Sequence, residues 1–225
     1  MRRIPVLPPF APGMRIGLLG GSFNPPHEGH VLVTRLVLQR LALDRVWWIA
    51  TPGNPLKPQA DLATLRARVN AARRLSPGPR VVVTDIEARI GSHYTYDTLA
   101  WIMRRGRGVH FVWIMGADNL AQFHRWRHWR AIADLAPIVV VDRPGWTLRA
   151  TSSPAGATLS RWRWPEHGSV RFAVSRPPAF LFLHGPRSQL SSTGLRRAVE
   201  ARGKWSGPRS QSSLGQDSVV YRAGS

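Results

Sequence analysis

The sequence predicts a single α/β domain with a Rossmann-like, doubly wound parallel sheet. Short apolar runs alternate with segments of helical spacing along most of the chain, and this alternation indicates repeated parallel βαβ units. Right-handed crossovers place helices on both faces of such a sheet, and ligands bind beyond the carboxyl ends of its strands. With 225 residues, the chain is long enough for one such domain with a sizeable core.

Six apolar runs are expected to form the strands. The first comes directly before a glycine turn, and the fifth is closed by Arg143-Pro144-Gly145. The expected strands cover residues 16–19, 45–50, 80–84, 109–115, 138–141 and 180–183. The first strand, with the loop and helix that follow it, should lie where the strand order of the sheet reverses.

Five segments are expected to be helical. In the first of them, Val33, Leu36, Val37 and Leu41 follow helical spacing. Glycine and proline turns end the second and third. The expected helices cover residues 31–41, 61–75, 95–105, 119–133 (as one or two short helices) and 193–202.

The remaining segments are expected to lie outside regular structure. Residues 1–13 are an N-terminal extension, residues 14–202 form the domain, and residues 203–225, rich in Gly, Ser and Arg, are expected to be a flexible basic tail. Residues 149–163 contain Thr-Ser-Ser-Pro-Ala-Gly-Ala-Thr and are expected to form an exposed connection.

The composition excludes several classes of protein. Hydrophobic residues make up 43% of the chain, but no apolar run reaches the eighteen or so residues of a membrane span. The N-terminal apolar stretch is too short and too interrupted by proline for a signal peptide. The absence of cysteine excludes disulfides, thiolate metal sites and a cysteine nucleophile. A cytoplasmic location is expected.

The net charge of +20 raises the alternative of a nucleic-acid-binding protein. Of the 32 basic residues only Lys57 and Lys204 are lysines, and the arginines are scattered rather than gathered in one run. Together with the many Ala, Pro and Gly residues, this bias is typical of a GC-rich genome. We therefore expect anionic small-molecule substrates rather than specific nucleic-acid binding.

The most informative motif follows the first strand: Gly20-Gly21-Ser22-Phe23-Asn24-Pro25-Pro26-His27-Glu28-Gly29-His30. Glycines let backbone N–H groups approach phosphate oxygens, and the N-terminus of the next helix carries partial positive charge. Two imidazoles three residues apart can point toward the same phosphates. The alternatives are a chance surface pair or half of a metal site. The His-Glu-x-x-His zinc helix does not fit this spacing, and no protein metal site is expected.

A second motif, Leu190-Ser191-Ser192-Thr193-Gly194-Leu195-Arg196, follows the last expected strand. Hydroxyl residues before a helix form a cap, and the exposed N–H groups of such a turn bind anions. An arginine one turn into the helix adds a two-pronged phosphate contact. The alternative is an ordinary helix cap with a solvated arginine.

Three further segments follow strands or precede helices. Asp118 comes after the fourth strand and could bind ribose hydroxyls, help to hold a metal, or cap the next helix. The spacing of Trp126 is by itself typical of a core aromatic residue, and Lys57 is either a phosphate ligand or a solvated loop residue. Tyr94 and Thr95 stand immediately before the third helix.

These motifs resemble those of the nucleotidyltransferases with a His-x-Gly-His motif. The core motif is shared with pantetheine-phosphate adenylyltransferases, cytidylyltransferases and FAD synthetases, but Gly-Ser-Phe-Asn-Pro-Pro-His resembles bacterial nicotinate-nucleotide adenylyltransferase. Residues 190–196 resemble the family's ISSTxIR motif, residues 116–120 its GxDxL, and residues 92–99 its SYTxxTL, whereas residues 51–57 match only in part. The likeness spans about residues 14–200.

The resemblance implies adenylyl transfer from ATP to nicotinate mononucleotide, with Mg²⁺ accompanying ATP, in NAD biosynthesis. It implies catalytic roles for His27, His30 and Arg196. The implied ATP-binding residues are Gly20, Gly21, Ser22, Phe23, His27, His30, Asp118, Ser191, Ser192, Thr193 and Arg196. The implied acceptor-binding residues are Asn24, Lys57, Tyr94, Thr95 and Trp126. The alternatives are another acceptor, such as nicotinamide mononucleotide or phosphopantetheine, and a basic nucleic-acid-binding protein on the same fold. A homo-oligomer is compatible with this interpretation.

Overall fold

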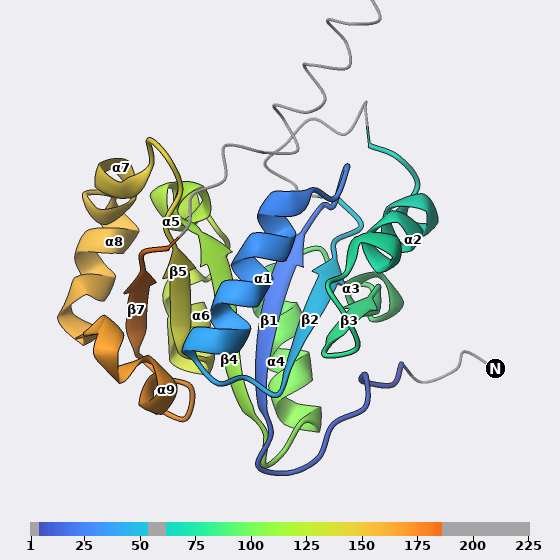
Figure 1. The fold of residues 1–225 in the computed structure, drawn as a ribbon, viewed down its shortest axis with the longest axis horizontal. Coiled ribbons are helices and arrows are strands. Elements are labelled where there is room, and N and C mark those ends of the chain that lie inside the picture. Colours follow the sequence, from blue (N-terminus) through green and yellow to red (C-terminus); the bar gives the residue numbers. More distant parts are fainter. Residues whose placement is uncertain (1–4, 54–61, 186–225) are drawn as a thin grey trace, which may run out of the picture.

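A seven-stranded sheet runs through the centre of the protein, with every neighbouring pair of strands parallel (Figure 1). The structure, a computed structural model, describes residues 5–53 and 62–185. The strands are β1 (Arg15–Gly21), β2 (Arg45–Ala50), β3 (Val81–Thr84), β4 (His110–Gly116), β5 (Ile138–Val141), β6 (Arg163–Trp164) and β7 (Phe180–Leu183). All six predicted strands are confirmed, and the two-residue β6 is an addition too short to be recognised in the sequence.

The helices of the described part cover both faces of this sheet, so the predicted doubly wound α/β class is confirmed. They are α1 (Glu28–Arg40), α2 (Leu65–Leu75), α3 (Ile86–Arg89), α4 (Thr95–Arg105), α5 (Ala117–Phe123), α6 (Trp129–Leu135), α7 (Thr147–Thr151), α8 (Pro154–Leu159) and α9 (Ser169–Phe172). Two short 3₁₀ turns cover Ser160–Trp162 and Glu166–Gly168. The predicted helix over residues 193–202 lies outside the described residues.

The strand order is β3-β2-β1-β4-β5-β7-β6. From β1 the chain moves outward to β2 and β3, and it then returns to place β4 on the other side of β1. The order therefore reverses between β1 and β4, and the loop after β1 lies at this switch point, as predicted.

Two apolar cores fill the space between the sheet and its helices, because successive strand residues point to opposite faces. Leu18 belongs to the core that includes Ile102 of α4, whereas Leu19 belongs to the core that includes Val37 of α1. Figure 1 shows α1 in front of the sheet and α4 behind it. No helix within the described ranges is long and apolar enough to cross a membrane.

The prediction of an exposed connection over residues 149–163 is wrong, since α7 and α8 occupy most of it. Ser153 caps α8 by accepting the N–H of Gly156 at 3.1 Å, and Pro154 occupies the first turn, where its missing N–H costs nothing. A side chain at Gly156 would come within 2.2 Å of the Ala150 carbonyl oxygen. The small residues that suggested a loop therefore serve close packing between two helices.

Two helix boundaries differ from the predictions because polar side chains cap the helices. The first helix begins at Glu28 rather than near residue 31, since His27 caps it. The second begins at Leu65, where Thr64 accepts the N–H of Ala67 at 3.3 Å. The segment 119–133 forms two helices, separated near His128, which has a left-handed φ of 54°.

The described part of the N-terminal extension packs against the domain. Leu7 is buried in the core, and the Pro9 carbonyl accepts a hydrogen bond from Arg45 Nη1 at 2.8 Å. The N–H of Gly13 donates to the carbonyl of Gly108 at 2.7 Å. These contacts attach the extension to the amino-terminal ends of the central strands, at the opposite end of the sheet from the turn after β1.

Candidate active site

The turn after β1 is held in place by aromatic packing beneath it. Phe23 is fully buried and has a left-handed φ of 46°, and its ring stacks on Trp48 with centroids 5.1 Å apart. The same ring lies 4.7 Å from the imidazole of His30. Phe23 therefore supports the turn from inside, so any direct contact with a phosphate falls to its backbone.

The glycines of this turn serve packing as much as ligand approach. A side chain at Gly20 would meet the Trp113 ring at 2.6 Å, whereas one at Gly21 would find ordinary contact with Phe23 at 3.4 Å. Neither glycine has a left-handed φ; that conformation falls on Phe23.

His27 and His30 cap the first turn of α1 with their own side chains. The Nδ1 atom of His27 accepts the N–H of Gly29 at 3.1 Å, and the Nδ1 atom of His30 accepts the N–H of His27 at 3.2 Å. This is a reciprocal capping box in which imidazoles take the usual places of hydroxyl and carboxylate groups. The two ring centroids are 4.0 Å apart. Because both Nδ1 atoms accept, each neutral ring carries its proton on Nε2.

Both imidazoles are held in the neutral form. Burial, together with the positive charge of Arg143, lowers the pKa of His27 to about 4, against a smaller opposing effect of Asp118. Burial, with smaller contributions from His27 and Arg143, lowers the pKa of His30 to about 3. At neutral pH the site therefore presents two Nε2–H donors that carry no net charge, on rings fixed by the helix backbone.

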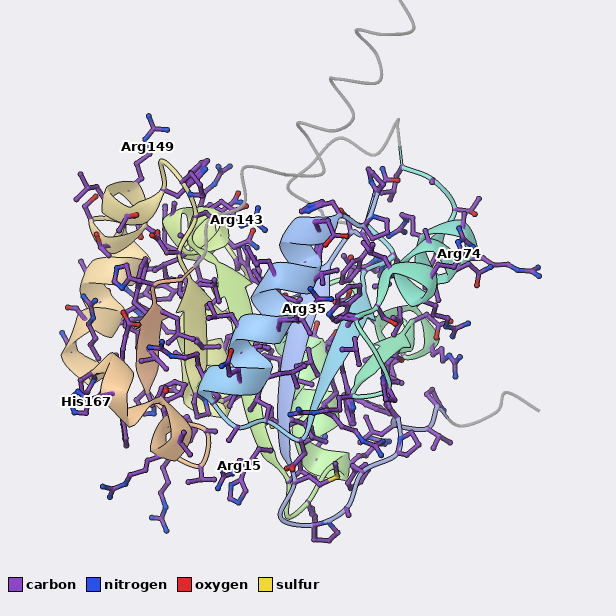
Figure 2. All side chains as sticks on the ribbon, in the orientation of Figure 1. Arg15, Arg35, Arg74, Arg143, Arg149 and His167 are labelled. Atoms are coloured by element: carbon purple, nitrogen blue, oxygen red, sulfur yellow. The ribbon has the colours of Figure 1, made fainter. Side chains whose placement is uncertain are left out.

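Arg143 brings positive charge to the same place and was missed at the sequence level, where it only marked the end of a strand. Its Nε lies 3.3 Å from Oδ1 of Asp118. It also lines a small hollow with Gly29 at the start of α1. Figure 2 shows Arg143 beyond the end of β5, beside the first turn of α1. A phosphate placed against the two histidines would therefore meet a guanidinium group from the segment after β5.

Asp118 is ion-paired to Arg143, and it lies in the first turn of α5 rather than at the cap, which is Gly116. A side chain at Gly116 would come within 2.4 Å of Asp118 Oδ1 and 2.8 Å of Arg143 Nε. The absence of a side chain at Gly116 is thus what lets the pair form. Through this ion pair, the Asp118 carboxylate, which was predicted to bind the nucleotide, is linked to the arginine beside the histidine motif.

Two of the predicted acceptor residues, Tyr94 and Thr95, lie at the start of α4. Tyr94 is its N-cap and 38% exposed, and Thr95 is its first residue. Tyr94 makes no side-chain cap hydrogen bond, so the first N–H groups of α4 remain available to an anion. The guanidinium of Arg127 lies 4.7 Å over the Tyr94 ring, which brings the segment of Trp126 next to Tyr94. Trp126 itself packs edge-on against Phe123 at 5.3 Å.

Glu87 is a second residue that the sequence analysis missed. This residue of α3 is buried, and its Oε1 lies 3.1 Å from Oγ1 of Thr98 on α4, which in turn lies 3.1 Å from Ser92 Oγ. The Ser92 hydroxyl accepts the N–H of Tyr94 at 3.2 Å. Burial raises the pKa of the Glu87 carboxyl. A buried polar network therefore fixes the start of α4.

Asn24 lies mostly inside the protein, where its Oδ1 accepts the N–H of Ala63 at 3.3 Å. It thereby joins the turn after β1 to the segment before α2. The other predicted site residues, Lys57, Ser191, Ser192, Thr193 and Arg196, lie outside the described residues. Within residues 5–53 and 62–185, no three His, Asp or Glu side chains come together as metal ligands would.

Comparisons with known proteins agree with this geometry. A family model described as cytidylyltransferase-like matches residues 18–198. A protein from Methylorubrum extorquens, named probable nicotinate-nucleotide adenylyltransferase, is 56% identical over 183 residues, covering 81% of this chain and 99% of its own length. A protein of the same name from Cereibacter sphaeroides is 53% identical over 194 residues, covering 86% and 100%. The chain belongs to the nicotinate-nucleotide adenylyltransferase family.

A solved structure with low sequence identity also supports the fold of this member of the nicotinate-nucleotide adenylyltransferase family. The nicotinic acid mononucleotide adenylyltransferase of Plasmodium falciparum, complexed with APC, superimposes with a TM-score of 0.59 at 14% identity, covering 82% of this chain and 83% of its own. The branch predicted from the motif after β1 is thereby confirmed by the curated relatives, and the fold class by the structures. The family match also includes Lys57 and residues 190–196.

Proposed function

We propose that this protein transfers the adenylyl group of ATP to nicotinate mononucleotide, forming nicotinate adenine dinucleotide and pyrophosphate in NAD biosynthesis. The observation that carries this proposal is the pair of neutral imidazoles, His27 and His30, fixed by reciprocal capping at the switch point of the sheet. Their Nε2–H groups suit phosphate oxygens whose charge shifts during transfer.

The reaction needs no nucleophile from the protein. A phosphate oxygen of the acceptor attacks the α-phosphorus of ATP in line and forms the new P–O bond. The bond from the α-phosphorus to the bridging oxygen breaks, and its electron pair leaves with pyrophosphate. Catalysis therefore consists of positioning and of charge stabilisation by preorganised donors.

On the ATP side, His30 donates to the α-phosphate and His27 to the outer phosphates. The guanidinium of Arg143 adds positive charge beside both rings, and the Arg143–Asp118 pair borders the adenosine side. Ser191, Ser192, Thr193 and Arg196 bind the outer phosphates in this proposal. Mg²⁺ enters with ATP as part of the substrate and would neutralise the charge of the leaving pyrophosphate.

On the acceptor side, the first turn of α4 receives the carboxylate of the pyridine ring through backbone N–H groups. Tyr94, Thr95 and Trp126 frame the ring, and Asn24 and Lys57 complete the set of acceptor-binding residues in this proposal. The arginines do not argue for nucleic-acid binding: Figure 2 shows Arg15, Arg35, Arg74, Arg143 and Arg149 spread over different parts of the molecule.

The proposal is tested by pyrophosphate release from ATP and Mg²⁺ with three acceptors in parallel: nicotinate mononucleotide, nicotinamide mononucleotide and phosphopantetheine. We expect a preference of at least about tenfold in kcat/KM for the first, because a site built for a carboxylate rejects a neutral amide. Turnover with only another acceptor would keep the mechanism and replace the substrate. No turnover with any acceptor, together with tight DNA binding at physiological salt, would refute adenylyl transfer.

A further inference from the structure

Arg68 of α2 is a buried arginine whose hydrogen bonds all go to backbone carbonyl oxygens. The residue is only 2% exposed. Its Nε donates to Ala63 at 2.8 Å, and its Nη1 donates to Ser22 at 2.6 Å and to Thr51 at 2.8 Å. Its Nη2 donates to Pro52 at 3.1 Å. One guanidinium therefore joins the turn after β1, the loop after β2 and the segment before α2.

The location is unusual for a charge. Burial lowers the pKa of the Arg68 guanidinium, and no carboxylate within the described ranges forms an ion pair with it. Removing a cation from water without an opposite charge is costly unless its donors are satisfied. A planar group with five donors in a fixed fork satisfies several carbonyls at once, which an ammonium group cannot do.

The carbonyls that Arg68 holds belong to peptide groups at the edge of the candidate site. In a trans peptide the C=O and N–H bonds point in opposite directions. Since Arg68 holds the Ser22 carbonyl, the N–H of Phe23 points away from Arg68, and the same holds for Pro52 and the N–H of Gly53. Arg68 thereby fixes the direction of the N–H groups of Phe23 and Gly53.

We propose that Arg68 is a positioning residue for adenylyl transfer, which fixes the turn after β1 and the loop after β2 so that their N–H groups face the bound phosphates. This inference rests on the proposed function for its chemistry. The Thr51 side chain also neighbours Glu87, so the connection continues to the network at the start of α4. Arg68 thus links the ATP half of the site to the acceptor half without touching either substrate.

The test compares Arg68→Ala and Arg68→Lys with Arg74→Ala. Arg74 is a matched control because it lies on the same helix, is exposed, and points outward in Figure 2. Circular dichroism and thermal unfolding establish that each variant is folded. Pyrophosphate release gives kcat and KM, and calorimetric titration with MgATP gives a dissociation constant that does not depend on the acceptor.

We expect Arg68→Ala to lower kcat about 100-fold, the size expected for a displacement of about 1 Å in a positioned group. Its dissociation constant for MgATP should rise about tenfold. Guanidinium chloride at about 20 mM, far below denaturing concentrations, should restore at least about tenfold of the lost kcat in Arg68→Ala. It should leave the wild type and Arg74→Ala unchanged. Arg68→Lys should lose about tenfold or more, because its ammonium lacks the fork.

Several outcomes would overturn the inference. One is a folded Arg68→Ala with kcat and ATP affinity within about threefold of the wild type. Another is a lysine variant that matches the wild type. A third is loss of folding in both variants, or a loss of activity that follows the unfolded fraction without rescue, since Arg68 would then be a structural core residue. If the wild type itself fails to turn over, the proposed function fails, and ATP binding by Arg68→Ala against Arg74→Ala still decides the inference.

Discussion

His30 accepts the backbone N–H of His27 through its Nδ1 atom at 3.2 Å, so the second histidine of the motif orients the first. His27 in turn accepts the N–H of Gly29. The spacing of three residues is therefore required by the helix cap as well as by the substrate. A ring fixed in this way can present only its Nε2–H to a ligand.

Replacing His30 with alanine should lower kcat by about 10²–10³, the usual effect of losing one transition-state donor. The free energy of unfolding should fall by about 1 kcal/mol, because one cap hydrogen bond is lost. Steady-state pyrophosphate release and chemical denaturation measure the two effects. The control is His167→Ala, in a 3₁₀ turn away from the site (Figure 2). A His30→Ala enzyme with near-normal kcat would remove His30 from the mechanism.

The stability of the protein should depend on pH through these same rings. An ordinary histidine titrates near 6.5, whereas the pKa of His27 is about 4 and that of His30 about 3. Between these values and 6.5 the unfolded chain binds more protons than the folded one, so stability is full above about pH 6.5 and falls as the pH drops. Each ring contributes a slope of up to about 1.4 kcal/mol per pH unit.

Urea denaturation from pH 7.5 to 4.5 tests this slope, and the double variant His27→Asn/His30→Asn should flatten it. Imidazole ¹⁵N NMR should show both rings as Nε2–H tautomers at pH 7, with no protonation until below about pH 5. Titration of either ring near 6.5, or an Nδ1–H tautomer, would contradict the neutral-donor arrangement.

Much of the fold follows from local patterns in the sequence. Ile138–Val141 and Phe180–Leu183 are runs of apolar residues buried on both faces of a parallel sheet, which is why their bounds were predictable. Residues 149–163 were not, because small polar residues are typical of loops and of tightly packed short helices alike. Only tertiary contact, here Gly156 against the Ala150 carbonyl, distinguishes the two.

The candidate site likewise contains residues that the sequence predicts and residues that it does not. His27, His30 and Asp118 belong to contiguous motifs that can be recognised in the sequence. Arg68, Glu87 and Arg143 contribute by contacts with backbone or side chains far along the chain, and no spacing rule announces them. Arg143 lies 25 residues after Asp118 in the sequence, and the two form an ion pair. Only the adjacency of β4 and β5 brings them together.

Replacing Gly116 with alanine should break the Asp118–Arg143 pair, because the added carbon would lie 2.4 Å from Asp118 Oδ1 and 2.8 Å from Arg143 Nε. We expect the KM for ATP to rise about tenfold or more, with an overpacking cost of about 1–3 kcal/mol in the free energy of unfolding. The control is Gly168→Ala, where the nearest atom would lie at 3.5 Å. An unchanged KM for ATP in a folded Gly116→Ala enzyme would show that the pair has no part in nucleotide binding.

Replacing Glu87 with glutamine should change stability in the opposite sense to the histidines. Burial raises the pKa of this carboxyl, so the folded protein binds its proton more tightly than the unfolded chain does. Its contribution to stability is therefore full at low pH and is lost as the pH rises through the folded pKa. Glutamine keeps the shape and an acceptor for Thr98 without this titration.

We therefore expect Glu87→Gln to be at least as stable as the wild type at pH 7.5, with an advantage that shrinks as the pH falls toward about 4. Denaturation curves across this range measure the difference, and Asp97→Asn, which removes an exposed carboxylate from α4, is the matched control. An advantage that grows as the pH falls would mean that Glu87 is stabilised as the carboxylate. In that case the donors around it, rather than its burial, would dominate its environment, and the start of α4 would be held by an ionic network instead of a neutral one.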